Sequence, residues 1–248
     1  MDIAACGHGD RAAHGSTVSS RSRVEDSGND AVVFSEAGAA GQGEEPGTGG
    51  LLESRAVAGG KKNAAQQRAW IFFEDESGFS QQPSIRRTWA PRGETPVLKA
   101  RGNHWSRTSV AAAVGFDWRG HRSRLLARTK PDSHNTESLM AFLLELKRFV
   151  RGQRVILVWD HLPAHRSKVM KRFLFEQRDW LQIEWLPGYA PDLNPAEGVW
   201  NNIKGREMAN FCPDYMDEAV TAFRRGLKRV SRSRKLPFAF LSHAGLSF

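Results

Sequence analysis

Two acidic residues in this chain of 248 residues follow apolar runs that are typical of buried strands. Asp75 comes shortly after residues 70–73 (WIFF), and Asp160 comes directly after residues 155–159 (VILVW). An uncompensated carboxylate beside a core costs several kcal/mol, so two of them at strand ends favour a bound cation. Mg²⁺ takes one or two carboxylates and completes its shell with phosphate oxygens, so the pattern indicates a metal site. The alternatives are local turns, at Asp160 ahead of a proline and at Asp75 ahead of a glycine.

A third acid, Glu197, lies in the segment WLPGYAPDLNPAEGVWNNIK at residues 185–204. Asn194 is placed as the N-cap of a helix and Pro195 as its first residue. Glu197 then stands at the third position, where a capping box would bond it back to the cap amide. The other interpretation makes Glu197 the last ligand of the metal site. The prolines of this segment restrict the backbone, as expected if the start of the helix must be held in one place, and this favours the metal ligand.

The elements that must position these acids follow from hydrophobic periodicity. Strands are predicted at 70–73, twice within 108–129, at 155–159 and within 181–188, with a hairpin return at 86–98. Helices are predicted within 135–150, within 167–180, from 194 onward and around 219–230. Strands first, followed by alternating helices and strands, predict an α/β protein with a mixed sheet and helices on its faces.

The first 60 residues differ in composition from the rest. They carry 12 of the 23 glycines, four basic and nine acidic residues, and few large apolar side chains. Such a segment cannot bury enough apolar surface to offset the cost of ordering the chain, so residues 1–60 are predicted to be a disordered low-complexity tail. Residues 61–248 hold 32 basic and 18 acidic residues, and this net charge of +14 attracts polyanions, of which nucleic acid is the usual one.

Several classes of protein are excluded by composition. Cys6 and Cys212 lie far apart, which leaves no disulfide framework and no zinc cluster and fits a reducing cytoplasm. No apolar run approaches the ~20 residues of a membrane-spanning helix, and the N-terminus has no signal-peptide core. We find no phosphate-binding glycine loop and no His-Glu-x-x-His motif. The sequence therefore predicts a cytoplasmic protein with no membrane partner.

Four strings carry a resemblance to a known family: EDESGF, TWAPRG, LVWDHLPAH and LPGYAPDLNPAEGVWNNIK. They resemble the catalytic domain of bacterial insertion-sequence transposases in the mariner-type superfamily, and most closely the insertion-sequence six-thirty family. The resemblance covers the chain from about residue 61 to residue 248. It implies a ribonuclease-H-like fold, in which a five-stranded mixed sheet is flanked by helices, and a protein that acts at the bacterial nucleoid.

The resemblance also implies a site and a reaction. Asp75, Asp160 and Glu197 match the three acids that hold two Mg²⁺ ions in this family, and Mn²⁺ is expected to substitute. Two ions activate the attacking water or DNA 3′-hydroxyl and stabilise the leaving oxygen. This suits the phosphodiester bond, whose uncatalysed hydrolysis is very slow. Strand alternation places Glu74 and Glu76 on the face of the strand opposite to Asp75. The implied partners are double-stranded DNA, as element ends and target, and a second copy of the chain in a homodimer.

Basic residues supply the predicted DNA surface. Phosphate contacts come mainly from lysine and arginine side chains, although a solvated basic face is the alternative for each of them. His165 matches a histidine of the family string and is predicted to orient a phosphate or a residue behind the metal ligands, with a local role at the start of a helix as the favoured alternative. The predicted DNA-contacting residues are Arg86, Arg87, Arg92, His165, Lys204, Arg224, Arg225 and Lys228.

The sequence departs from the family in one respect. Transposases of this group carry helix-turn-helix modules ahead of the catalytic domain, and residues 1–60 contain none that we recognise. We therefore expect a truncated or split transposase. The alternatives are a Mg²⁺-dependent nuclease that does not transpose, a catalytically idle DNA-binding remnant, and a two-carboxylate glycoside hydrolase, which the charge of +14 disfavours.

Overall fold

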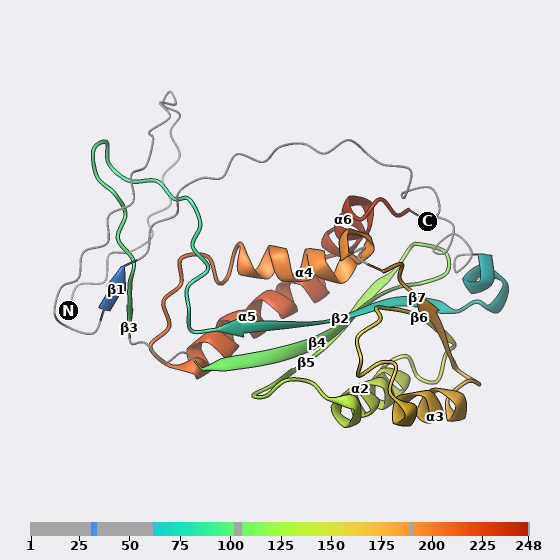
Figure 1. The fold of residues 1–248 in the computed structure, drawn as a ribbon. Coiled ribbons are helices and arrows are strands. Elements are labelled where there is room, and N and C mark those ends of the chain that lie inside the picture. Colours follow the sequence, from blue (N-terminus) through green and yellow to red (C-terminus); the bar gives the residue numbers. More distant parts are fainter. Residues whose placement is uncertain (1–30, 34–61, 102–105, 189–190, 248) are drawn as a thin grey trace.

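The computed structural model describes residues 31–33, 62–101, 106–188 and 191–247, and its centre is a five-stranded sheet in the order β5-β4-β2-β6-β7 (Figure 1). The strands are β2 (Trp70–Ser80), β4 (Arg107–Phe116), β5 (Ser123–Lys130), β6 (Val155–Trp159) and β7 (Leu181–Trp185). β4 is antiparallel to both β2 and β5, whereas β6 and β7 continue the sheet in parallel from β2. This mixed sheet has the ribonuclease-H-like order, which confirms the predicted fold class.

Helices cover both faces of the sheet (Figure 1). α2 (Thr136–Phe149) and α3 (Lys168–Glu176) pack on one face, against Trp70 and Phe72 of β2. The other face carries α4 (Pro195–Lys204), α5 (Met216–Arg232) and α6 (Leu236–His243). Ile71 and Phe73 point to that second face, because successive strand residues alternate between faces. Residues 74–76 of β2, which are all acidic, alternate between the two faces in the same way.

α2, α3 and α4 begin at polar side-chain caps. Asn135 and Ser138 form a capping box at the start of α2, and the Ser167 hydroxyl accepts from the Met170 amide at the start of α3. α6 was not predicted, because its eight residues carry no polar cap that bonds to the helix and have a proline near the start.

β2 is longer than its apolar run. The strand was expected to end near residue 73, but it continues to Ser80 because β4 pairs with it over its whole acidic half, with Asp75 opposite Ala112. The consecutive acids Glu74, Asp75 and Glu76 therefore lie inside the strand and not after it. This extension holds their side chains in strict alternation, which a turn would not do.

A second, two-stranded sheet lies apart from the first. β1 (Ala31–Val33) pairs antiparallel with β3 (Lys99–Arg101), so three residues of the predicted tail form a strand. The rest of residues 1–60 lies outside the described residues, and a disordered tail there stays a prediction. A short helix also covers residues 62–67. Within the described part of the chain, no helix has the length and apolarity needed to cross a membrane.

Candidate metal centre

The register of two parallel strands brings Asp75 and Asp160 level. Phe73 of β2 lies opposite Val158 of β6, so two residues further along each chain come Asp75 and Asp160. β6 ends at Trp159, and Asp160 begins the loop that follows. Because β6 ends here while β2 continues, Asp75 lies beside the carboxyl end of a parallel strand. Open α/β sheets bind their ligands at such strand ends.

Helix α4 brings Glu197 to the same place. Asn194 caps the helix by accepting from the Ala196 amide at 3.1 Å, and its own amide nitrogen donates to the main-chain oxygen of Glu74 at 3.3 Å. One turn after Glu197, the Trp200 indole donates to Asp75 Oδ2 at 2.7 Å. Residues three apart share a helix face, so Glu197 and Trp200 both point toward β2.

The two interpretations of Glu197 differ in what its carboxylate touches. In a capping box the Glu197 carboxylate would accept from the main-chain amide of Asn194. Among the described residues, the cap of α4 has one side-chain bond, in which Asn194 accepts from the Ala196 amide. In the described part of the chain, the Glu197 carboxylate has no hydrogen bond and no ion pair. Half-buried and unpaired, it is free to bind an ion.

Crowding of carboxylates changes the protonation of Asp75. Burial, together with the negative charges of Glu197, Glu76 and Asp160, raises the pKa of Asp75 to about 7, although the bond from Trp200 opposes the shift. The carboxylate of Asp75 thus lies close enough to those of Asp160 and Glu197 to feel their charge. Their oxygens form the donor set that Mg²⁺ prefers, so the residues present fit the ion that the resemblance implies.

Lys204 lies two turns further along α4, at the edge of this site. Its ammonium donates to the Ser77 hydroxyl at 2.9 Å, and burial lowers the pKa of Lys204 although the charges of Glu197 and Asp75 raise it. The same side chain lines a pocket of about 220 Å³ whose other walls come from residues 78–80, residues 82–84 and Met208. A cation is thus fixed near Glu197 and Asp75.

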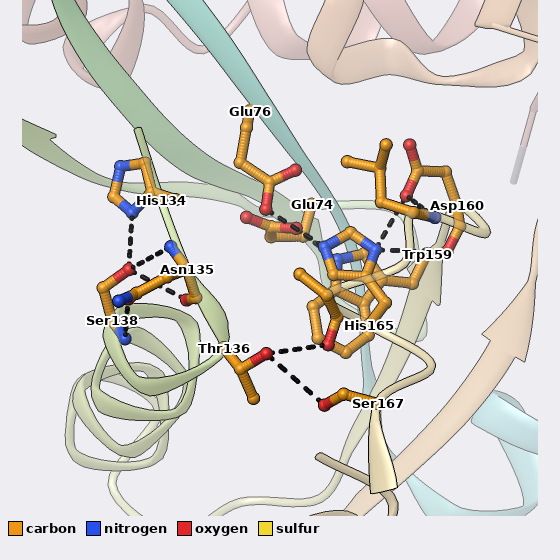
Figure 2. Close-up of polar contacts among 12 residues, drawn as sticks. Glu74, Glu76, His134, Asn135, Thr136, Ser138, Trp159, Asp160, His165 and Ser167 are labelled. Atoms are coloured by element: carbon orange, nitrogen blue, oxygen red, sulfur yellow. Dashed lines mark hydrogen bonds and ion pairs between the residues drawn. The ribbon is translucent and has the colours of Figure 1, made fainter. Parts of the chain in front are cut away.

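Glu74 and Glu76 occupy the opposite face of β2, as the alternation predicted. The Trp159 indole donates to Glu74 Oε2, and Glu74 is almost completely buried. Figure 2 shows the His165 ring between Glu76 and Asp160. His165 Nε2 lies 3.0 Å from Glu76 Oε1, and His165 Nδ1 lies 2.7 Å from Asp160 Oδ1.

The protonation states follow from these contacts. Burial and the neighbouring charge of Glu76 hold the pKa of Glu74 well above its ordinary value. Burial lowers the pKa of His165, but the bonds with Asp160 and Glu76 outweigh it and raise the pKa to about 9. Both ring nitrogens of this imidazolium therefore donate. Burial raises the pKa of Asp160 in turn, but the bonds from His165 and the Leu162 amide outweigh it and lower the pKa.

The most compact set of possible metal ligands among the described residues is Glu74, Glu76 and His165, whose ligand atoms lie within 4.8 Å of one another. Both nitrogens of His165 already bond to carboxylates, so neither offers a lone pair to a metal. This set is an ion-pair network. The acids Asp75, Asp160 and Glu197 are more widely spread, as expected of mutually repelling groups that are to share two ions ~3.5–4 Å apart.

The structure corrects one predicted DNA contact and leaves the others as predictions. His165 is fully buried and both its nitrogens are engaged, so it does not face DNA. The remaining basic residues are reachable by a polyanion. Lys204 is half-buried, and the exposed ones are Arg86, Arg87, Arg92, Arg224, Arg225 and Lys228.

The exposed arginines lie on two separate elements. The loop at residues 85–98 carries Arg86, Arg87 and Arg92 around Trp89, whose side chain is 96% exposed. Asn210 holds this loop by bonding to both main-chain groups of Arg86, at 2.8 and 3.0 Å. The others form the outer face of α5, opposite its buried stripe.

Sequence reasoning missed Trp200 and Trp159, the two indoles that hold acids on either face of β2. Trp200 stands three residues after Glu197, and this helical spacing is a signal that the sequence contains. Trp159 precedes Asp160 and reads as one more apolar residue of its strand. Nothing in the sequence connects it to a carboxylate 85 residues away.

Comparison with known proteins adds to this geometry. The family described as DDE superfamily endonuclease matches residues 70–215, more than half of the chain. No curated protein sequence matches significantly.

Solved structures resemble the chain at low sequence identity. A Mos1 transposase paired-end complex with left transposon end is 18% identical, with a TM-score of 0.48 over 86% of this chain and 67% of that chain. The catalytic domain of Mos1 mariner transposase is 18% identical, with a TM-score of 0.40 over 84% of this chain and 100% of that chain. A chain of a simian T-cell lymphotropic virus intasome is 14% identical, with a TM-score of 0.43 over 67% and 49% of the two chains.

Proposed function

Because the chain belongs to the DDE superfamily endonuclease family, we propose that residues 61–248 form a transposase catalytic domain that cuts and joins DNA at the ends of an insertion sequence. The observation that carries this proposal is the approach of Asp75, Asp160 and Glu197 to one another from β2, the loop after β6, and α4. The motif strings of these segments support the insertion-sequence six-thirty family as the specific group.

The three acids would hold two Mg²⁺ ions, which activate the attacking oxygen and stabilise the leaving oxygen of a phosphodiester. Trp200 holds one oxygen of Asp75 by a single neutral donor, so the other oxygen stays available. Glu197 is unpaired among the described residues and completes the set. Four positive charges against three carboxylates leave a net positive site, which suits a scissile phosphate.

DNA binding rests on charge beside this site. Lys204 is fixed at the edge of the acids by Ser77, where an ammonium can meet a phosphate flanking the scissile bond. The loop at residues 85–98 and the outer face of α5 add exposed arginines further away. Double-stranded DNA is therefore the proposed partner, with each lysine or arginine contact adding to the salt dependence of binding.

The test uses the purified full chain and a labelled duplex that carries the ends of the element from which the gene comes, intact or pre-cut. With Mg²⁺ or Mn²⁺ we expect cleavage or strand joining, and with EDTA none. Asp75→Asn, Asp160→Asn and Glu197→Gln should each reduce the rate more than ~100-fold, since residues behind a metal ligand alone cost 10–100-fold. Retention of DNA on a filter should change little.

Glu176→Gln is the matched control, because it removes a surface carboxylate of α3 that, among the described residues, pairs with Arg172 alone. It should cleave like the wild type. A wild-type chain that binds DNA yet shows no metal-dependent cleavage of any of these substrates would instead be an idle DNA-binding remnant. Cleavage of every duplex without joining would favour a nuclease that does not transpose.

A further inference from the structure

Asp160 differs from the other two acids in how it is held. It begins a loop, and its side chain is 38% exposed. The Leu162 amide donates to Asp160 Oδ1 at 3.1 Å, and His165 Nδ1 lies 2.7 Å from the same oxygen. His165 Nδ1 also lies 3.2 Å from the main-chain oxygen of Asp160. Every contact recorded for this carboxylate in the described part of the chain thus falls on Oδ1, and Oδ2 is left for an ion.

His165 is itself fixed on three sides. Its ring is fully buried and stacks on Trp159, with ring centres 3.8 Å apart. Nε2 bonds to Glu76, which stands next to Asp75 in β2. The His165 amide donates to the Leu162 carbonyl at 3.0 Å and closes the turn that leads back to Asp160. One imidazole therefore joins the loop after β6 to the strand that carries the first acid (Figure 2).

We infer that His165 is a positioning residue that fixes the orientation of Asp160 at the metal centre, with Glu76 as the anchor that fixes His165. The inference rests on the proposed function, because it assigns Asp160 the part of a metal ligand. A loop carboxylate that faces two other carboxylates turns away from them unless something holds it. The bond to Oδ1 opposes that movement and costs no rearrangement when an ion arrives.

Binding of Mn²⁺ alone, without DNA, tests the inference. Free Mn²⁺ can be counted by electron paramagnetic resonance during titration of the full chain. His165→Phe keeps the ring stacked on Trp159 and removes both bonds, and it should raise the Kd for Mn²⁺ about tenfold or more. His161→Phe is the matched control, because this exposed histidine is next to Asp160 but stacks on Trp185. It should leave the Kd within about twofold of the wild-type value.

A pair of variants at Glu76 separates hydrogen bonding from charge. Glu76→Gln and Glu76→Leu remove the same charge, but only the amide oxygen of glutamine can still accept from His165. We expect Glu76→Leu to bind Mn²⁺ about tenfold more weakly than Glu76→Gln. Glu76→Gln keeps an acceptor for the buried His165 Nε2 and removes a charge beside the buried Glu74, so it should fold even if His165→Phe does not. Thermal unfolding of each variant shows whether its stability changes in step with its Kd.

The outcomes separate the two proposals. Equal Mn²⁺ affinity of Glu76→Gln and Glu76→Leu, or of His165→Phe and the wild type, overturns the positioning role and leaves the metal centre in place. Loss of affinity that only follows loss of stability across the set overturns it too. A wild-type chain that binds no Mn²⁺ overturns the metal centre, and the positioning role falls with it.

Discussion

The two faces of β2 treat adjacent carboxylates in opposite ways. On one face Asp75 receives a single bond from the Trp200 indole and lies near the unpaired Glu197. On the other face Glu74 is buried against the Trp159 indole, and Glu76 is paired with His165. The second face thus pairs its acids with an indole and an imidazolium, while on the first face Asp75 lies among other carboxylates. The difference teaches that the most compact cluster of acids need not be the proposed metal centre, because the histidine of that cluster is already bonded to two carboxylates.

Exchange of a carboxylate for its amide on each face is the largest expected contrast. Asp75→Asn removes a proposed metal ligand and should lower the rate of DNA cleavage more than ~100-fold. Glu74→Gln keeps an oxygen that can accept from the Trp159 indole and should leave the rate within about threefold. Cleavage assays with Mg²⁺ on the same duplex measure both. Equal losses would show that both faces take part in catalysis and would end the contrast.

The two indoles should differ in what their loss affects. Trp200→Phe keeps an aromatic ring on α4 but leaves Asp75 without its donor, so Mn²⁺ affinity should fall about tenfold. Trp159→Phe leaves a buried carboxyl oxygen without its partner, so the free energy of unfolding should fall by about 1–3 kcal/mol while Mn²⁺ affinity stays within about threefold. Metal titration and urea unfolding of both variants give the four values. A fall in Mn²⁺ affinity for Trp159→Phe that matches the one for Trp200→Phe would contradict this division.

The smallest expected effect concerns pH. The pKa of Asp75 is about 7 in the folded chain and near 3.8 when unfolded, so between these values the folded chain binds more protons. The free energy of unfolding should therefore decrease as pH rises from about 4 to about 7. In EDTA this decrease should be steeper in the wild type than in Asp75→Asn, as measured by urea unfolding at pH 5 and pH 7.5.

Added Mg²⁺ provides the control for this pH effect. At pH 7.5 it should restore stability to the wild type and have little effect on Asp75→Asn, because an ion takes the place of the proton on Asp75. Identical pH slopes for the two chains would show that Asp75 does not have the raised pKa assigned to it.

Periodicity predicted much of this fold, because each strand of the large sheet has an apolar run of its own. The level placement of Asp75 and Asp160 was also within reach, since both follow runs that end at one edge of a sheet. The length of β2 was not, because its acidic half is a strand only through pairing with β4. Local sequence cannot report such a partner.

The parts of the site that were missed all depend on contacts between distant segments. His165 bonds to Glu76, 89 residues away, whereas the sequence favoured a local role at the start of a helix, with a phosphate contact as the alternative. Trp200 bonds to Asp75 across 125 residues. The residue types that do the chemistry are visible in the sequence, but the groups that orient them become visible only when the chain is folded.

The bond from Asn194 to the main chain of Glu74 has a consequence for how such a centre can be switched. It fastens the first turn of α4 to the strand one residue before Asp75, and that helix carries both Glu197 and the indole that holds Asp75. A shift of α4 along the sheet would therefore move one proposed ligand and release another in the same movement. The proposed centre would then be assembled or taken apart by a single rigid-body displacement, without any change in the acids themselves.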